Sequence, residues 1–400
     1  MKRVTVLLLA LVLFTFSGCN TAPGGSMSTD ADRSFLHVMS SLYACDTGDV
    51  MYFVGYLGNF LHYVDKETGI SGFLCGRPEC EHNSDECNAY VTHSVTALSA
   101  YDGRLYWVNI GNGTVYSAEL DGTGHQTVRE FDRELFPNTA YDMFYLFHRE
   151  TLYLACVKGT IKDGAAVYSN YVCAFPLDPK EEPFVILDEE LAEDQLSTGF
   201  TTIQPYGDKL YIVTDFQMDD PEKGREETPL LFNFSILCWD AQTRELSTLY
   251  HDGESPIEGV RELWAMDDGM IFNSWDRDSN FCPIQKFFFE TGEITELFEL
   301  DASIGIADGL VTGSDYDRDA NTWTVILKDF EGNTLVEDTY SVSEAVIDPF
   351  FFGRDETCAY FYYNDRFKSN GNPNDIWTIL AVALDGSGMR VLCSEEDPAV

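Results

Sequence analysis

The chain of 400 residues carries 67 acidic and 25 basic side chains, which gives a formal net charge of −42 at neutral pH. Such a surface repels phosphate backbones and anionic lipid headgroups, so we expect no nucleic-acid partner. Acidity of this degree keeps a protein soluble and by itself assigns no ligand.

The chain begins with the features of an export signal at residues 1–18. Two basic residues precede an apolar run at 4–16 that is too short to span a bilayer comfortably. The tetrapeptide FSGC at 16–19 resembles a bacterial lipobox, which implies that Cys19 is diacylated and becomes the new N-terminus. An ordinary signal peptide cut nearby is the alternative. We therefore expect an extracytoplasmic protein, lipid-anchored in a bacterial cell membrane and displayed at the cell surface.

Residues 19–33 are predicted to contain the lipidated cysteine and a flexible tether that follows it at 20–33. These residues are small and polar and show no periodic apolar face. No second linker of this kind follows, so residues 34–400 are predicted to form a single domain held close to the membrane.

The region from residue 34 onward is built of repeats. Residues 95–131 are the clearest unit, with four short runs rich in Val, Tyr, Trp and Leu that are separated by tight Gly-containing turns. Two interleaved series of turn-and-strand signals occur seven times each, about 40 to 60 residues apart, as is typical of propeller blades. We predict an all-β fold, a seven-bladed β-propeller of four-stranded antiparallel blades. A pair of β-sandwiches or another all-β array is the competing architecture.

Two segments carry a family resemblance. RLYWVNIGNGTVYSAELDGTGHQTV at 104–128 resembles the repeat of YWTD propellers of the low-density-lipoprotein-receptor type, and DIWTILAVALDGSGMRVL at 375–392 matches its later half. More generally, the chain is similar to uncharacterised propeller lipoproteins of anaerobic, mostly Gram-positive bacteria, which are related to the TolB-like and YWTD-like families. A Cys-Pro-Cys-His-Cys stretch early in the chain is a recurrent feature of that group, and the resemblance supplies no biochemical role for it.

The matching stretch here is FLCGRPECEHNSDECNAY at 73–90, which contains Cys75, Cys80, His82 and Cys87. Three thiolates and one imidazole form an accepted structural zinc set, although a single residue between Cys80 and His82 is unusual among zinc modules. Outside the cytoplasm, the interpretation we favour is at least one disulfide, in which two of these cysteines pair and the third joins another cysteine such as Cys45. A structural metal is the alternative, and free thiols are a third. Each of these gives the stretch a structural role, because four protein ligands would leave zinc no open position.

The loops between the second and third strands of the predicted blades are short in blades 1 and 2 and long in blades 3 to 7. Loops on a rigid scaffold often carry binding residues, so this side of the ring is the expected ligand surface, and the cysteine stretch should lie on it. Three of the loops repeat Asp and Arg beside Trp or Tyr, which suits recognition of sugars or peptides. Local pairing of Asp with Arg, which would organise a duplicated hairpin, is the interpretation we favour for this pattern. The candidate ligand-binding residues are Trp275, Asp276, Arg277, Asp278, Tyr316, Asp317, Arg318, Asp319, Asp365 and Arg366.

The sequence contains none of the common motifs for a serine nucleophile, a zinc-binding helix or a phosphate-binding glycine loop. We therefore interpret the protein as a binding or scaffold module for a glycan, peptide or protein, in preference to an enzyme. The alternative is a surface hydrolase or lyase acting on glycans, because the many carboxylates allow an acid–base pair that only geometry can identify.

Overall fold

A computed structural model of the chain describes thirteen stretches of it, which are residues 42–55, 60–91, 95–131, 140–191, 195–218, 231–255, 257, 259–260, 262–274, 282–300, 303–342, 349–364 and 376–396. The predicted signal and tether at 1–33, with the lipidation site Cys19, lie outside these residues. Within the described stretches, no helix has the length and apolar character needed to cross a bilayer.

The described residues form seven four-stranded antiparallel sheets, each made of consecutive strands. Blades 1 to 4 contain β1 (Leu42–Asp46), β2 (Val50–Gly55), β3 (His62–Asp65), β4 (Ser71–Phe73), β5 (Val95–Tyr101), β6 (Arg104–Asn109), β7 (Thr114–Glu119), β8 (Gln126–Glu130), β9 (Ala140–His148), β10 (Thr151–Lys162), β11 (Ala165–Pro176), β12 (Phe184–Glu190), β13 (Gln195–Tyr206), β14 (Lys209–Met218), β15 (Leu231–Asp240) and β16 (Glu245–Ser255). Blades 5 to 7 contain β17 (Leu263–Ala265), β18 (Gly269–Asn273), β19 (Cys282–Phe288), β20 (Ile294–Leu300), β21 (Ser303–Ala307), β22 (Leu310–Asp317), β23 (Thr322–Asp329), β24 (Thr334–Ser341), β25 (Phe350–Arg354), β26 (Cys358–Asn364), β27 (Ile376–Ala383) and β28 (Met389–Glu396).

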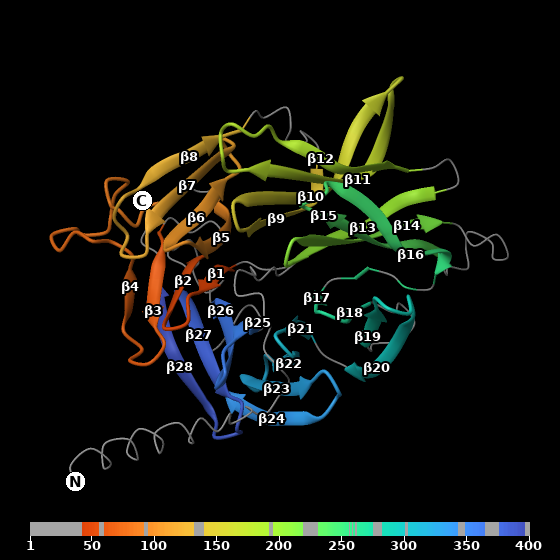
Figure 1. Ribbon diagram of the computed structural model, residues 1–400. Helices are drawn as coiled ribbons and strands as arrows, with labels where there is room; N and C mark the ends of the chain where they lie inside the picture. The colour runs from red at the N-terminus through yellow and green to blue at the C-terminus, as the bar shows by residue number, and fades with distance from the viewer. Residues whose placement is uncertain are drawn as a thin grey trace, which may run out of the picture.

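The sheets are arranged as a ring of blades around a central axis (Figure 1). The first strand of each blade contacts the first strand of a neighbouring blade, as β1 does with β5 and β21 with β25, so these strands lie innermost. The prediction of a seven-bladed β-propeller with four-stranded antiparallel blades is confirmed, and the competing sandwich architecture is wrong.

Strand β23 illustrates why these sequences form blades. Its side chains alternate between half-buried and fully buried positions along the whole strand, with Trp323, Val325 and Leu327 facing the core. This period of two matches the pleat of a strand and keeps the apolar face of the sheet against the neighbouring blade. The Trp323 indole donates a hydrogen bond of 2.7 Å to Ser314 Oγ, which satisfies its buried N–H group.

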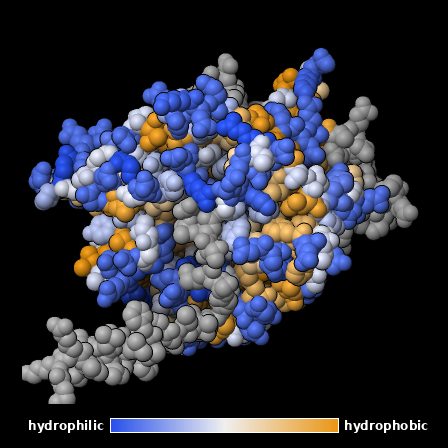
Figure 2. Space-filling model, in the orientation of Figure 1, coloured by the Kyte–Doolittle hydropathy of each residue, from blue (hydrophilic) through white to orange (hydrophobic). Residues whose placement is uncertain are grey.

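The hydrophobic core is divided among the interfaces between neighbouring blades. Val108 and Val115 of blade 2, for example, pack in one cluster with Phe147 and Leu154 of blade 3. On the face drawn in Figure 2, hydrophilic residues cover most of the described surface and apolar residues form separate patches. Hydrophilic residues thus gather on this face, while the apolar residues of the core fill the interfaces between blades.

The ring closes where blade 7 packs against blade 1 (Figure 1). Met51 and Phe53 of blade 1 share a cluster with Tyr360 and Trp377 of blade 7. Within the described residues each of these two sheets is made of its own four strands, so side-chain packing joins them without a shared strand. Segment 34–39, whose place in the last blade the sequence leaves open, lies outside the described residues.

Candidate metal centre

The link between β4 and β5 contains the cysteine stretch, and it folds back on blade 1. Its two ends are joined to the start of β3, because Leu74 N–H donates to Leu61 O and Leu61 N–H donates to Ala89 O, each at 2.8 Å. An isolated antiparallel bridge between Phe60 and Tyr90 extends this contact. The link is therefore a closed loop whose base is fixed by backbone hydrogen bonds.

The link lies at the outer edge of the ring, beside blade 2 (Figure 1). Leu74 packs with Leu105 and Ala118 of blade 2, and Gly122 in the β7–β8 turn approaches the backbone of Leu74. A second contact between the two blades is the hydrogen bond of 3.0 Å from Tyr52 Oη to the carbonyl of Leu120. Leu74, at the start of the link, thus packs blade 1 against blade 2. The link itself lies away from the central axis (Figure 1), a position that suits a structural role.

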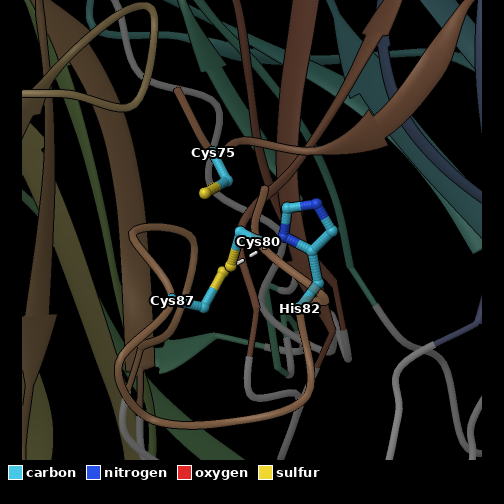
Figure 3. Close-up of side chains that lie close together, drawn as sticks. All are labelled: Cys75, Cys80, His82 and Cys87. Carbon is cyan, nitrogen blue, oxygen red and sulfur yellow. Dashed lines mark hydrogen bonds between the residues drawn. The ribbon is translucent and has the colours of Figure 1, made fainter. Parts of the chain in front are cut away.

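Short turns within the link bring the four candidate ligands together. Cys80 N–H donates to Arg77 O at 3.1 Å, and Cys87 N–H donates to Ser84 O at 3.1 Å. His82 has a φ of 51°, in the left-handed region, and this conformation reverses the chain between the two turns. Figure 3 shows the side chains of Cys75, Cys80, His82 and Cys87 pointing toward a common centre.

The donor atoms of these four residues all lie within 4.8 Å of one another. His82 Nδ1 is 3.3 Å from Cys87 Sγ. A tetrahedral site with Zn–S of about 2.3 Å and Zn–N of about 2.0 Å places its donors roughly 3.5–3.8 Å apart, so the widest pair would have to approach by up to about 1 Å on binding. The ten cysteines among the described residues, these three included, are all free thiols. The sequence prediction of a Cys, Cys, His and Cys cluster is confirmed at the level of geometry.

Residues around the cluster fix its ligands. The imidazole of His82 stacks on Phe73 with ring centroids 4.8 Å apart, and Cys87 is buried against Phe60 and Ala89. Arg77 was not singled out by the sequence interpretation, yet its Nη2 lies 3.9 Å from Cys80 Sγ and donates to Glu86 O. The signal that could have identified Arg77 is its position in the sequence, where it is a positively charged residue between Cys75 and Cys80.

The local environment shifts the pKa values of two of the thiols, Cys75 and Cys87, in opposite directions. Burial opposes ionisation of Cys75, but the backbone N–H groups of Arg77 and Asn88, helped by the neighbouring thiols, outweigh it and lower the pKa of Cys75. Burial raises the pKa of Cys87 to about 12, although Ala89 N–H points at its sulfur from 3.4 Å. Because metal ions bind thiolates, binding at this site would release protons.

Of the candidate ligand-binding residues, the structure describes those on the β22–β23 hairpin, Tyr316, Asp317, Arg318 and Asp319. Asp317 Oδ1 accepts the N–H groups of Asp319 at 2.9 Å and Ala320 at 3.0 Å, so this carboxylate holds the turn together. Tyr316 is buried, and its hydroxyl donates to Asn321. These contacts favour a role in organising the hairpin. The remaining candidates lie outside the described residues, namely Trp275, Asp276, Arg277, Asp278, Asp365 and Arg366.

No family model matches the chain, and no curated protein matches it. Among solved structures it is similar to an oligogalacturonate lyase in complex with manganese, at 12% identity and a TM-score of 0.49, over 90% of this chain and 96% of that one. The β-propeller domain of the trilobed protease from Pyrococcus furiosus is 10% identical with a TM-score of 0.47, over 88% of this chain and 98% of that one. A structure of a nidogen/laminin complex is 12% identical with a TM-score of 0.37, over 73% of this chain and 93% of that one. Likenesses at this level assign no chemistry to the chain.

Proposed function

We propose that the protein is a lipid-anchored β-propeller outside the cytoplasm that acts as a binding module, with a structural zinc ion in the link between blades 1 and 2. The observation that carries the zinc proposal is the convergence of three thiols and one imidazole within 4.8 Å. Donor sets rich in thiolate favour zinc over magnesium, calcium or manganese, which prefer oxygen ligands.

A structural role for the ion follows from the donor count. Cys75, Cys80, His82 and Cys87 would fill the four positions of a tetrahedral zinc ion, so none remains for a water molecule or substrate. The residues that would hold the ion come from one short link, and the turns of that link are stabilised by few backbone hydrogen bonds. A bound ion would therefore hold the link in place between the two blades.

The binding role is supported by the shape of blade 3. Strands β10 and β11 pair with each other along twelve residues each, whereas β9 pairs with β10 only as far as Lys158 and β12 pairs with β11 only from Ser169. The remainder forms a two-stranded arm that projects from the ring (Figure 1), and Ile161 on it is 74% exposed. This arm is one of the long loops expected to contact a glycan, peptide or protein ligand.

Metal analysis of the full-length protein, purified without chelator, tests the zinc proposal. We expect one zinc per chain by mass spectrometry and a thiolate-to-cobalt absorption band after replacement with cobalt. Cys80→Ser should lose both signals, whereas Cys238→Ser, at a buried cysteine of blade 4, should keep them. Absence of metal after reconstitution with zinc, or a mapped disulfide between two cysteines of the link, would refute the proposal.

Metabolic labelling with a radioactive fatty acid tests the anchor. Incorporation into the wild-type chain, with loss of label and of membrane association in Cys19→Ala, is expected if this cysteine is diacylated. A labelled Cys19→Ala variant, or an unlabelled wild type in a host that processes lipoproteins, would contradict it.

Glycan and peptide arrays test the binding role. We expect Ile161→Asp to weaken binding, while Ile70→Asp, at an isoleucine that is 62% exposed in the β3–β4 turn, leaves it intact. Equal loss in both variants would show that the arm has no special part in binding, and absence of binding to both arrays would count against a glycan or peptide ligand.

A further inference from the structure

A cavity of about 610 Å³ lies between blades 4 and 5. It is bordered by the β13–β14, β15–β16 and β17–β18 turns, which lie at the opposite ends of the blades from the β2–β3, β10–β11 and β22–β23 connections. The cavity is therefore separate from both the cysteine link and the loop-rich side. Its lining residues are Tyr206, Gly207, Asp208, Lys209, Tyr211, Cys238, Asp240, Gln242, Leu249, Met266, Asp267 and Phe289.

The floor of the cavity is apolar and aromatic. Tyr211 of blade 4 and Phe289 of blade 5 stack with ring centroids 4.8 Å apart and an interplanar angle of 9°. Cys238 is buried beside them, and burial raises the pKa of its thiol, which keeps it neutral. Met266 and the partly exposed Leu249 complete an apolar lining.

The rim carries three carboxylates that are held in position by polar contacts. Arg149 Nη1 and Gln242 Nε2 each lie 2.5 Å from an oxygen of Asp208. Tyr206 Oη donates to Asp267 Oδ1 at 2.6 Å across the two blades. Such contacts fix the carboxylates before any ligand arrives, which reduces the entropy lost on binding.

The third carboxylate, Asp240, is held by its own turn. Its Oδ1 accepts the N–H groups of Gln242 and Thr243, each at 2.9 Å. The Thr243 N–H, against a smaller effect of desolvation, lowers the pKa of Asp240, so this group is ionised at neutral pH. A carboxylate has about four acceptor sites, so capacity remains for a ligand.

Charge then selects the ligand. The lining contributes three negative charges from its aspartates and one positive charge from Lys209. Arg149, which pairs with Asp208, adds a second positive charge, so the formal charge around the cavity is −1. We propose that this cavity binds an organic cation, an ammonium or guanidinium group carried on an apolar stem. The stem would cover the aromatic floor while the charged head meets the carboxylates of the rim. The charge of −42 on the whole chain would draw such a ligand to the protein.

Two sources can supply this chemistry, a lysine or arginine side chain of a protein and a free polyamine. Isothermal titration of the full-length protein at low ionic strength can separate them, with an acetylated tetralysine amide, spermidine and the neutral sugar cellotetraose as probes. We expect the cationic probes to bind at one site and cellotetraose to give no signal. Preference for the tetralysine peptide points to a protein partner, and preference for spermidine points to a free polyamine.

A matched pair of variants separates the cavity from general attraction to an acidic protein. Asp240→Asn removes one rim charge, and Asp385→Asn removes the same charge from the corresponding turn of blade 7, where Asp385 Oδ1 accepts Ser387 N–H at 2.9 Å. We expect Asp240→Asn to lower the affinity for the cationic probes by about threefold to fivefold and Asp385→Asn to leave that affinity unchanged. Equal weakening in both variants, binding of cellotetraose alone, or no binding of either cation would overturn the proposal.

Discussion

At the scale of single residues, Arg77 is the side chain that most directly affects the proposed metal site. Zinc with three thiolates and a neutral imidazole carries a net charge of about −1, and this needs compensation near the protein surface. Nη2 of Arg77 lies 3.9 Å from Cys80 Sγ, and the nearby thiols of Cys75 and Cys80 favour the charged form of the guanidinium group. Its additional bond to Glu86 O ties the first half of the link to the second.

Replacing Arg77 should therefore weaken metal binding without removing a ligand. We expect Arg77→Gln to reduce zinc affinity by about tenfold, the usual size of an effect from a residue behind the ligands. Arg77→Lys should recover part of the loss, because it restores the charge but not the forked geometry. Competition with a chromophoric chelator measures both. Identical affinities for Arg77→Gln and wild type would show that the guanidinium group has no part in binding.

At the scale of elements, two turns with nearly the same sequence have different surroundings. LDGTG at 120–124 and LDGSG at 384–388 are the β7–β8 and β27–β28 turns, and Gly122 and Gly386 have φ values of 76° and 73°. A Cβ on Gly122 would lie 2.4 Å from the carbonyl oxygen of Leu74, whereas a Cβ on Gly386 would meet nothing within 4 Å. The first turn packs against the cysteine link and the second does not.

This pair separates backbone strain from crowding. Gly386→Ala should lower the free energy of unfolding by about 1 kcal/mol, because a non-glycine residue is strained at positive φ. Gly122→Ala should cost about 2 kcal/mol more, because the link must also move away from the turn. Urea denaturation monitored by tryptophan fluorescence compares the two. A similar loss in both variants would mean that the link yields easily and is not firmly packed on blade 2.

The same turns show what the sequence can predict. A turn pair such as Asp and Gly before an apolar strand is local information, so the seven blades and their strand order could be predicted from residues close together in the chain. The cysteine cluster was predictable for the same reason, since Cys75 to Cys87 span one short link. The contact between Gly122 and Leu74 was not, because the sequence does not show which turn a link will touch.

At the scale of the whole molecule, closure of the ring depends on residues far apart in the sequence. Lys66 Nζ lies 2.8 Å from Asp46 Oδ2 in its own blade and 3.1 Å from Asp355 Oδ2 in blade 7, 289 positions away. Arg390 of blade 7 donates to the carbonyl of Lys66 at 2.7 Å, and the lysine side chain is only 7% exposed. No local pattern marks Lys66 as this bridge, so closure could not be predicted from the sequence.

Removing the positive charge of Lys66, which bridges blades 1 and 7, should make the closed ring less stable. We expect Lys66→Met to lower the free energy of unfolding by about 2 kcal/mol, because two partly buried carboxylates lose their common partner. Lys286→Met is the control, since Lys286 pairs with Asp268 inside blade 5 at the same distance of 2.8 Å; it should cost about 0.5 kcal/mol. Thermal unfolding measures both variants. Equal losses of unfolding free energy in the two variants would show that the bridge between blades 7 and 1 stabilises the fold no more than an ion pair within one blade.

Asp355 gives the stability of blade 7, where the ring closes, a dependence on pH. Partial burial opposes its ionisation, but the Tyr360 hydroxyl and the N–H groups of Thr357 and Cys358 outweigh this and hold the pKa of Asp355 well below its usual range. A carboxylate whose folded pKa is lowered stabilises the fold fully above its unfolded pKa, and the contribution is lost as the pH falls through the folded pKa. Asp46 does not lose stabilising free energy in this way as the pH falls, because burial raises its pKa and so disfavours its ionised form in the folded state.

The difference in stability between wild type and Asp355→Asn should therefore depend on acidity. We expect the difference to be largest above about pH 4, where an unfolded aspartate is ionised, and to shrink steadily below it. Urea unfolding at several pH values between 7 and 3 measures it. Glu356→Gln removes a charge from the next residue and controls for the general effect of charge. A difference between wild type and Asp355→Asn that stays constant, or grows below pH 4, would show that the ionised form of Asp355 does not stabilise the fold.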